Sequence, residues 1–329
     1  MPVISIIMPI YNGEKYLREA LDSVRNQRYR NWECLCINDG GTDASVAIVT
    51  EFAKADNRFV LIDKANEGVA TTRNYGINHS KGEFITFLDQ DDILHTRFLE
   101  LSVSAAESTG ADVVSIGINT VYDNRFDTEE EVVQSEIRTD NHVIDSWIEA
   151  LSSKGFANIN AWGKLYKRDA LAPVRFPEGV FGADDFVFTM RIMLKRGRWA
   201  FCEDTKLYIY RMNPENITSR MPAKYIYGFL EAARIIGQEL QGCKDLTGKQ
   251  MKAYFKAESK RILSWAIKKT VRNSYAPVEV VKIQELLVET RKSGVLRFYS
   301  LRDWLKYVLF VRGNMRMLTV FFPRLAKPR

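Results

Sequence analysis

The feature that most restricts the fold is an alternation of short apolar runs with helix-period segments over the first 118 residues. Each apolar run is bounded by turn formers, so we predict strands at residues 3–9, 33–37, 59–62, 83–88 and 112–118. Helical periodicity fills the stretches between them. In the first such stretch, Asn12 is a predicted cap and apolar residues recur at i, i+3, i+4 and i+7. Strands alternating with helices predict an α/β fold, with a mostly parallel sheet covered by helices on both faces.

Polar or acidic residues follow three of the predicted strands. Tyr11 follows the first, Asn38-Asp39-Gly40 the second, and Asp89-Gln90-Asp91-Asp92 the fourth. In open α/β sheets, ligands bind beyond the carboxyl ends of the strands, so these side chains are candidates for one site. Asn, Asp and Gly are also ordinary turn formers, and both interpretations stay open for each of them.

The acidic run at residues 89–92 is harder to explain as a turn, because three carboxylates within four residues repel one another. A divalent cation would neutralise them. Hard oxygen ligands select Mg²⁺ or Mn²⁺, and Mg²⁺ is commonly held by one or two carboxylates together with substrate phosphates. We therefore expect Mg²⁺ or Mn²⁺ as the cofactor.

Composition excludes several classes of protein. The four cysteines lack the CxxC spacing of zinc sites, and three scattered histidines argue against a His-rich metal or triad enzyme. The first apolar run has neither a basic segment before it nor a small-residue cleavage site, and no apolar stretch approaches the ~20 residues that span a bilayer. We expect a cytoplasmic protein with reduced thiols.

Charge and pattern change along the chain. Residues 221–329 hold 22 Lys and Arg against 8 Asp and Glu, a net charge of +14, whereas residues 1–220 carry −8. We predict an irregular segment at 119–142, a helix at 144–151, a helix opening at Asp184-Asp185, and a strand over 199–210. From residue 223 the pattern is helical and basic. We therefore expect a catalytic domain at 1–220 and a basic helical region at 221–329 that meets an anionic surface, with no nucleic-acid partner.

Four segments of the first 120 residues resemble the family 2 glycosyltransferases with the GT-A fold. They are SIIMPIYNGEKYL, INDGGTD, NEGVATTRNYGI and GEFITFLDQDD, in the order and spacing of the family. Weaker similarity runs through NAWGKLYKRDAL and GADDF to LYIYRMNPENITSR, so the resemblance covers about two-thirds of the chain. It implies the GT-A fold and transfer of a sugar from a nucleotide-diphosphate donor, expected to be a UDP-sugar. The acceptor would be a glycan or lipid-linked saccharide in bacterial surface-polysaccharide synthesis.

The resemblance also implies donor-site roles for matching residues. Pro9, Tyr11 and Asp39 would hold the nucleotide base, and Arg73 would lie near the base or the phosphates. Asp89 and Asp91, which flank Gln90, look like the family's Asp-x-Asp pair that contacts ribose and metal-bound diphosphate. A carboxylate can accept the imide N–H of uracil while an aromatic ring stacks on the base. One departure bears on the donor: Asn38 stands where the family usually has Asp.

On the acceptor side the resemblance implies that Asp185 is the general base. Asp184 fills a position usually held by Glu, and Trp162, Lys164 and Arg211 are further candidates for acceptor or phosphate contacts. Alternatives stay open: acidic residues are common at helix N-termini, buried aromatics dominate cores, and most arginines are solvated or ion-paired. Transfer by a single displacement inverts the anomeric centre. A nucleotidyltransferase and a non-catalytic glycan-binding module are the alternative functions.

The tail at residues 300–322 has the pattern of a basic amphipathic helix. Leu301, Trp304, Leu305, Val308 and Leu309 fall on one predicted face, with Lys and Arg interspersed. Such a helix fits an anionic membrane interface, but a helix packed on the protein would look the same. Because the implied acceptors are lipid-linked, we expect peripheral contact with the inner face of the cell membrane.

Overall fold

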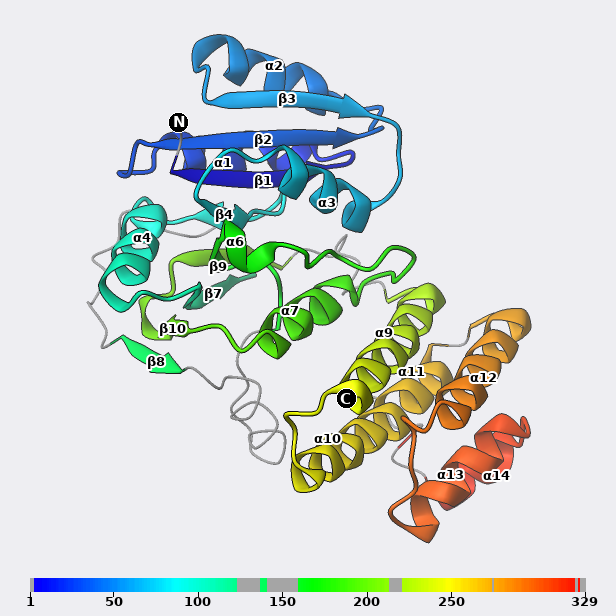
Figure 1. Ribbon diagram of the computed structural model, residues 1–329. Coiled ribbons are helices and arrows are strands. Elements are labelled where there is room, and N and C mark those ends of the chain that lie inside the picture. The colour runs from blue at the N-terminus through cyan, green and yellow to red at the C-terminus, as the bar shows by residue number, and fades with distance from the viewer. Residues whose placement is uncertain are drawn as a thin grey trace. The chain divides into compact units, whose positions relative to one another are not determined.

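The computed structural model describes residues 3–122, 137–140, 159–212, 221–273, 275–322 and 325 (Figure 1). The helix expected at 144–151 and most of the irregular segment at 119–142 lie outside these residues. The described chain divides into two compact units. The first draws on residues 1–143, 158–178 and 188–216, and the second on 144–157, 179–187 and 217–329.

The first unit is built on an eight-stranded sheet of order β3-β2-β1-β4-β9-β6-β10-β8. Its strands are β1 (Ile4–Ile10), β2 (Trp32–Asp39), β3 (Phe59–Lys64), β4 (Phe84–Phe87), β6 (Val113–Ile116), β8 (Arg138–Asp140), β9 (Lys164–Lys167) and β10 (Trp199–Cys202). β3, β2, β1 and β4 run parallel, as do β6 and β10, whereas β9 and β8 pair antiparallel with their neighbours. The predicted parallel sheet is confirmed in its first half, and β9 makes the whole sheet mixed.

Helices connect the strands of this unit at positions close to those predicted. They are α1 (Glu14–Arg25), α2 (Ser45–Ala55), α3 (Val69–His79), α4 (Phe98–Thr109) and the short α6 (Arg168–Leu171). The boundary between the units falls within α7 (Asp184–Leu194). In α1 the predicted apolar face is confirmed, because Leu17, Ala20, Leu21 and Val24 are all buried.

Two predicted strands are each divided between two sheets. The run 112–118 breaks at Gly117 into β6 and β7 (Ile118–Val121). The run 199–210 gives β10 and β11 (Tyr208–Arg211), separated by the 3-10 turn η1 (Glu203–Thr205). β11 and β7 join β5 (Ile93–Leu94) in a second sheet of order β5-β11-β7. The prediction of continuous strands over 112–118 and 199–210 is wrong. An apolar pattern does not show where the chain leaves one sheet and joins another.

The second unit is helical after residue 221. Its helices are α9 (Ala223–Gly242), α10 (Gly248–Arg261), the π-helical turn η2 (Ile262–Ala266), α11 (Ile267–Arg272), α12 (Pro277–Lys292), α13 (Leu301–Val311) and α14 (Met315–Phe321). A buried apolar cluster from α9, η2, α12, α13 and α14 forms its core. No helix within the described ranges combines the length and the apolar character needed to cross a bilayer.

The helix predicted in the tail is confirmed as α13, but the protein covers only part of its predicted apolar face. Leu309 and Phe310 are buried in the core, whereas Leu301 and Trp304 are 78% and 45% exposed. The helix therefore packs on the protein with one side and presents apolar side chains to solvent on another, so the two interpretations of the tail apply to different faces of α13.

Candidate active site

The sheet changes direction of winding between β1 and β4. From β1 the chain adds β2 and β3 on one side and then returns to place β4 on the other. Pairing of β1 with β4 ends at Ile7 and Phe87, whereas pairing with β2 continues to Ile10 and Asn38. The loops after β1, β2 and β4 therefore meet at one edge, at a topological switch point, where ligands bind in open α/β sheets.

Tyr11 presents its ring to solvent at this edge. The side chain is 51% exposed, unusual for a large aromatic residue. Its backbone is held by the Gln90 amide, which accepts from the Tyr11 N–H at 2.8 Å and donates to the Tyr11 carbonyl at 3.1 Å. A Cβ on Gly13 would lie 2.3 Å from Gln90 Oε1, so glycine is needed there for this bridge. Pro9, by contrast, is buried within β1, so we place it in the sheet rather than against a ligand.

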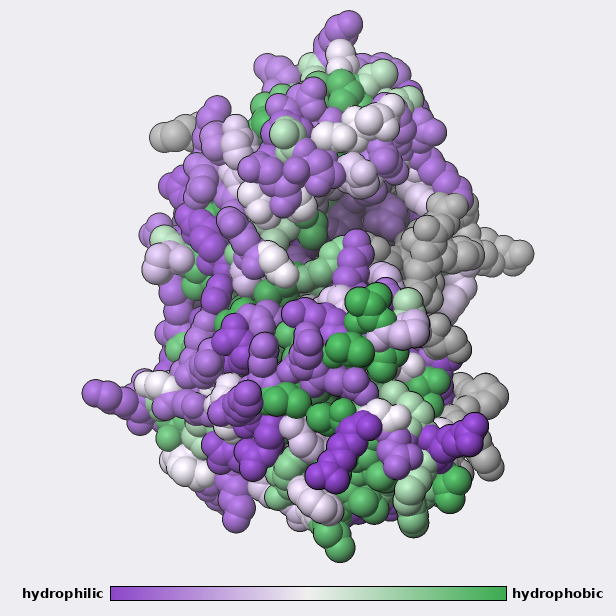
Figure 2. Space-filling model, turned by 90° about the vertical axis from the view of Figure 1, so that its right-hand side faces the viewer, coloured by the Kyte–Doolittle hydropathy of each residue, from purple (hydrophilic) through white to green (hydrophobic). Residues whose placement is uncertain are grey.

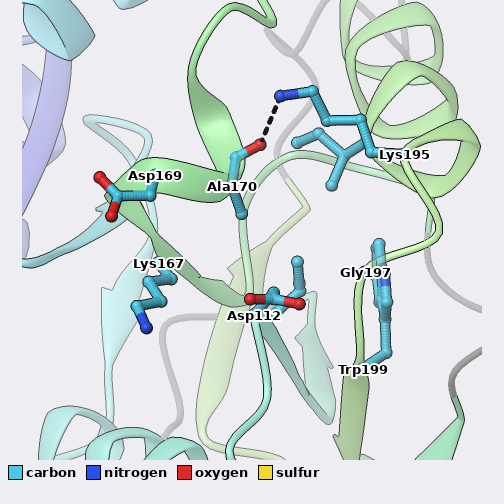
Figure 3. Close-up of a pocket in the computed structure, with 9 residues that line it drawn as sticks. Asp112, Lys167, Asp169, Ala170, Lys195, Gly197 and Trp199 are labelled. Atoms are coloured by element: carbon cyan, nitrogen blue, oxygen red, sulfur yellow. Dashed lines mark hydrogen bonds between the residues drawn. The ribbon is translucent and has the colours of Figure 1, made fainter.

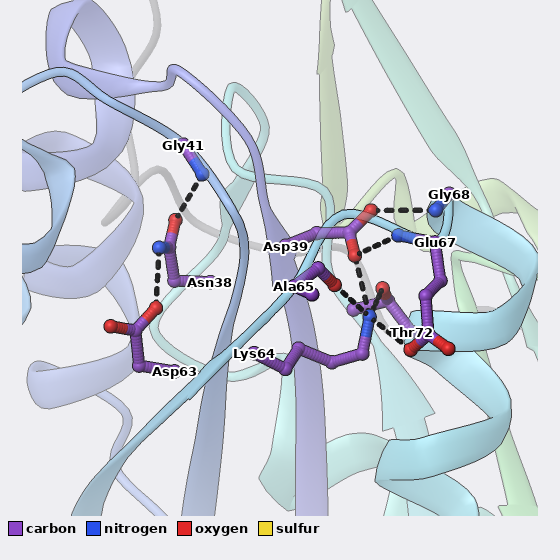
Figure 4. Close-up of polar contacts among 9 residues, drawn as sticks. All are labelled: Asn38, Asp39, Gly41, Asp63, Lys64, Ala65, Glu67, Gly68 and Thr72. Atoms are coloured by element: carbon purple, nitrogen blue, oxygen red, sulfur yellow. Dashed lines mark hydrogen bonds and ion pairs between the residues drawn. The ribbon is translucent and has the colours of Figure 1, made fainter.

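Asp39 is the centre of a polar network at the end of β2 (Figure 4). Its Oδ1 accepts from Lys64 Nζ at 2.6 Å and from the Glu67 N–H at 2.9 Å, and its Oδ2 accepts from the Gly68 N–H at 2.9 Å. Burial would raise the pKa of Asp39, but hydrogen bonds from Lys64, Glu67 and Thr72 outweigh it and lower the pKa. The carboxylate therefore stays ionised at the N-terminus of α3.

Lys64 is a member of this polar network that the sequence reasoning missed. It ends β3, and its ammonium also pairs with Glu67 at 2.9 Å. The predicted third strand stops at residue 62, two residues before the end of β3 at Lys64. Applied to the third strand with its true end, the same rule would have found Lys64.

The presence of Asn rather than Asp at position 38 is explained by its contact with Asp63 on β3. Its side-chain Nδ2 donates to Asp63 Oδ1 at 2.8 Å, and its Oδ1 accepts from the Gly41 N–H at 3.2 Å. Asn38 is 2% exposed. An amide can donate to the Asp63 carboxylate, which an ionised Asp at position 38 could not do. The departure from the family pattern is therefore matched by a local acceptor.

The loops after β1 and β2 cap each other's helices. Asp43 Oδ2 accepts from the Glu14 N–H at 2.8 Å at the start of α1, and Glu14 Oε2 accepts from the Ala44 N–H at 2.9 Å at the start of α2. The prediction that Asn12 caps α1 is wrong. Gly13 occupies that position, and Asn12 instead accepts from the Thr42 N–H at 2.8 Å. These hydrogen bonds connect the loop after β1 to the loop after β2.

The acidic run after β4 separates into different environments. Asp89 is partly exposed and its Oδ1 pairs with Arg73 Nη2 at 2.7 Å; Asp91 is half-buried. Asp92 is 1% exposed, with its carboxylate bonded to the Tyr208 hydroxyl at 2.7 Å and the Arg211 N–H at 2.9 Å. Burial raises the pKa of Asp92 well above its usual range, and Asp91 and Asp89 raise it further. Asp92 therefore anchors the turn from within.

Arg211 lies behind this turn. Its Nε donates to the Asp91 carbonyl at 3.0 Å, and its Nη2 pairs with Glu19 at 2.6 Å. The side chain is 3% exposed and stacks over Tyr16 at 4.5 Å. Arg211 was a candidate for an acceptor or phosphate contact. Its burial and ion pair argue against that role, and it holds the Asp91 backbone instead.

Trp162 and Lys164 are buried as well. Trp162 is 8% exposed and stacks on Tyr208 at 4.7 Å and on Tyr210 at 5.0 Å. Lys164 is fully buried in β9, and its Nζ donates to the Asn160 carbonyl at 2.6 Å. We therefore place neither side chain on the acceptor side; both support the sheet beneath the site.

Asp89 and Asp91 can serve a metal ion that arrives with a substrate. Within the described ranges, no three His, Cys, Asp or Glu side chains converge as a metal cage. Mg²⁺ usually needs only one or two carboxylates when phosphates supply the other oxygens. Asp92 is buried and Asp89 is paired with Arg73, so the carboxylates at this turn fit a metal ion that is held by one or two carboxylates together with substrate phosphates.

The other two predicted carboxylates belong to the second unit. Asp184 and Asp185 open α7, with Asp184 4% exposed and Asp185 half-buried. The predicted helix start is confirmed. Acidic side chains in the first turn also interact favourably with the helix dipole, so both carboxylates stabilise the start of α7.

A cavity of about 300 Å³ lies at the opposite edge of the large sheet (Figure 3). It is lined at the start of β6 and β10 and the end of β9, by residues that include Asp112, Lys167, Lys195 and Trp199. Lys195 is held there by the Ala170 carbonyl at 3.2 Å. This edge carries the amino ends of the parallel strands, so the cavity is separate from the switch-point site.

Comparison with known proteins agrees with the fold and the motifs. The family model described as glycosyl transferase family 2 matches residues 5–160. Glycosyltransferase GlyG of Streptococcus pneumoniae is 32% identical over 228 residues, which is 65% of this chain and 72% of GlyG. The chain belongs to glycosyltransferase family 2. It spans only 33% to 64% of the length of three other curated glycosyltransferases of the family.

Solved structures show a similar fold over the whole chain. The fragment of S. aureus TarS that comprises residues 1–349, in complex with UDP-GlcNAc, has a TM-score of 0.75 at 20% identity, and the match covers 100% of this chain and 93% of that fragment. A mannosyltransferase of Pyrobaculum calidifontis in complex with GDP-Man and Mn²⁺ has a TM-score of 0.54 at 17% identity, over 98% of this chain and 88% of that one. The predicted GT-A fold is confirmed.

Proposed function

We propose that this protein transfers a sugar, with inversion, from a UDP-sugar to a hydroxyl of a glycan or lipid-linked acceptor in bacterial surface-polysaccharide synthesis. The observation that carries the proposal is the edge between β1 and β4. There an exposed aromatic ring, an ionised carboxylate and an acidic turn stand together at the switch point. Those are the groups needed for a base, a ribose and a metal-bound diphosphate.

The donor base would stack on the ring of Tyr11, whose backbone is held by the Gln90 amide. Asp39 is ionised and can accept an N–H from the base. The Tyr11 ring favours a flat base of either size, whereas an acceptor carboxylate favours a base with an imide N–H. This combination fits the uracil of a UDP-sugar; guanine also has a ring N–H, so the GDP-sugars of the donor panel test the choice of base.

The diphosphate would meet Asp91 and Asp89, with Arg73 beside them. Arg73 is 5% exposed and stacks on Phe176 at 5.3 Å, so its charge is fixed in direction. Mg²⁺ or Mn²⁺ held by Asp91 and Asp89 would stabilise the negative charge that develops on the leaving diphosphate. Arg211 donates to the Asp91 carbonyl, and Asp92 in turn accepts from the Arg211 N–H, so these contacts support the backbone that carries Asp91.

Asp185 would take the proton of the acceptor hydroxyl as that oxygen attacks C1 of the sugar. The carbon–oxygen bond to the diphosphate breaks as the new glycosidic bond forms, so one displacement inverts the anomeric centre. Asp184 would lie on the acceptor side beside the base. General bases contribute about 10²–10⁴-fold to such reactions.

A donor panel tests the proposal. Purified protein with Mn²⁺ or Mg²⁺ is offered UDP-, GDP- and CMP-sugars, and nucleotide release and acceptor mass are measured. We expect release from a UDP-sugar, loss of release and weaker UDP binding in Asp91→Ala, and a 10²–10⁴-fold lower turnover with unchanged donor binding in Asp185→Asn. The exposed Glu178→Gln is the matched control. Nucleotidyl transfer, or wild-type turnover of Asp91→Ala, would overturn the proposal.

We also propose that α13 and α14 touch the inner face of the cell membrane. Leu301 and Trp304 of α13 and Met317, Val320 and Phe321 of α14 are between 43% and 78% exposed. Figure 2 shows hydrophobic residues among hydrophilic ones on the surface of the helical unit, in the lower part of the view. Exposed Arg302, Arg312 and Arg316 lie on the same two helices or the turn between them and suit anionic headgroups.

Co-sedimentation with anionic vesicles tests this contact. We expect binding at low salt, release at high salt, and loss of binding in a Trp304→Ser, Phe321→Ser double variant. Val278→Ser, at a 75% exposed position of α12, is the control. Point variants are required, because α13 and α14 contribute buried residues to the core and truncation would damage the fold. Full-length protein that ignores anionic vesicles at low salt contradicts the contact.

A further inference from the structure

Residues 179–187, which carry Asp184 and Asp185, pack against α9 and α10 within the second unit. We propose that α9 and α10 set the position of these carboxylates, with Gly228 and Arg261 as positioning residues for the reaction. The inference rests on the proposed role of Asp185 as the base. It gives the helical region, whose sequence suggested only a surface contact, a part in catalysis.

Gly228 of α9 allows the backbone of the carboxylate segment to lie directly on the helix. A Cβ at this position would be 2.1 Å from the Phe181 carbonyl oxygen and 2.8 Å from the Phe181 nitrogen and carbonyl carbon. These are backbone atoms, so a side-chain rotation cannot relieve the overlap. Three residues before Asp184, the chain is therefore fixed against α9 by the absence of a side chain on Gly228.

The neighbours of Gly228 on α9 hold the same segment. Lys224 Nζ lies 3.9 Å from the centre of the Phe181 ring. Gly182 has a φ of +70°, and a Cβ there would come within 2.5 Å of the Tyr225 ring. The path of the chain between Phe181 and Asp184 thus follows the surface of α9 at two successive residues.

Arg261 at the end of α10 holds the segment from its other end. Its guanidinium lies 5.1 Å from the ring of Phe186, the residue after Asp185, and 4.2 Å from the ring of Phe229. Glu258 binds the guanidinium through two hydrogen bonds of 2.6 and 2.9 Å and is itself 4% exposed. A planar group fixed in this way keeps the Phe186 ring, and so the first turn of α7, in one place.

The size of the expected effect follows from the overlap at Gly228. Real Cβ atoms essentially never approach another heavy atom closer than 3.0 Å, so a contact of 2.1 Å forces Phe181 or α9 to move by about 0.9 Å. Misplacement of a catalytic group by about 1 Å can cost about 10²-fold in rate. We expect Gly228→Ala to lower kcat by about 10- to 100-fold, whereas UDP affinity and the donor KM change less than twofold.

Gly242→Ala is the matched control, because Gly242 ends the same helix and an added Cβ there meets nothing within 4 Å. A second comparison uses Arg261→Lys and Arg261→Met. Lysine keeps the charge over the two rings and should retain more of kcat than methionine does. Melting temperature and UDP binding, measured on every variant, establish that the compared proteins are folded.

A double variant separates positioning from general damage. In an Asp185→Asn background the carboxylate is already gone, so Gly228→Ala should produce no further loss of kcat. Equal fold-losses in both backgrounds, or wild-type kcat in Gly228→Ala while Asp185→Asn is inactive, would overturn the positioning proposal. Full activity of Asp185→Asn would instead overturn the assigned base, and this result is recognised without reference to Gly228.

Discussion

Replacing Asn38 by Asp restores the residue usual in the family, and we expect it to destabilise this protein. The Asn38 Nδ2 donates to Asp63 at 2.8 Å, and the side chain is 2% exposed. Asn38→Asp exchanges the donor for a second acceptor, so two carboxylate oxygens would face each other at hydrogen-bond distance. The effect should be larger than that of most conservative substitutions.

The magnitude follows from two contributions. A hydrogen bond to a charged acceptor contributes about 1.5–3 kcal/mol. Repulsion between the carboxylates adds to its loss, but Asp63 is exposed and solvent screens part of this repulsion. We expect the free energy of unfolding of the first unit to fall by about 2–3 kcal/mol at pH 7.

Native-state amide hydrogen exchange measures this change, because it reports the opening of the β2 core without requiring the two units to unfold together. The sign of the pH dependence is defined. The introduced carboxyl would have a folded-state pKa above its unfolded value, owing to burial and to Asp63. Its penalty is therefore fully present above the folded pKa and disappears as the pH falls below the unfolded value near ~3.9.

The exchanged pair provides the control. Asn38→Asp combined with Asp63→Asn reverses donor and acceptor, and it should recover most of the lost stability. A loss under ~0.5 kcal/mol in Asn38→Asp at pH 7, or a loss that the second substitution leaves unchanged, would show that the Asn38–Asp63 contact is not what fits asparagine to this position.

Three further predictions concern the same edge of the sheet. Gly13→Ala should displace the Gln90 amide from its two hydrogen bonds with the Tyr11 backbone, each of which contributes about 0.5–1.5 kcal/mol, and should weaken UDP binding about tenfold by titration calorimetry; unchanged affinity would separate Gln90 from the donor site. Because the pKa of Asp39 is lowered in the folded state, its stabilisation is complete above its unfolded pKa and is lost as the pH falls through the folded pKa. Asp39→Asn should therefore flatten the acid dependence of amide exchange in β2, and an unaltered dependence contradicts this. Tyr208→Phe removes a donor from the buried Asp92 carboxyl and should destabilise the first unit by about 1–3 kcal/mol in the same exchange experiment; a neutral result would contradict the anchoring role.

Sequence patterns predict best where one local rule decides the structure. The apolar run of β1 predicted a strand whose ends are correct within one residue, and the i, i+3, i+4 spacing of α1 predicted a helix and its buried face. The resemblance correctly indicated the family and the GT-A fold. The candidate donor residues were found because parallel strands end at one edge, a rule that needs only strand order.

Prediction failed where a side chain's partner is distant in the chain. Arg211 and Trp162 looked like site residues beside recognisable motifs, yet both are buried against partners far along the chain. Arg211 pairs with Glu19, which is 192 positions away, and the sequence around either residue does not indicate that contact. The division of the run 199–210 between two sheets is a similar case, because its apolar pattern suits either sheet equally.

The mutual capping of α1 and α2 restricts how the sequence of this protein can change. Asp43 serves the helix before it, and Glu14 serves the helix after it, so neither loop is complete without the other. Grafting the loop after β2 from another enzyme, to alter donor choice, would remove the cap of α1 as well. The two loops therefore depend on each other. We expect sequence changes that alter donor preference at the tips of these loops, and we expect positions 14 and 43 to change only together.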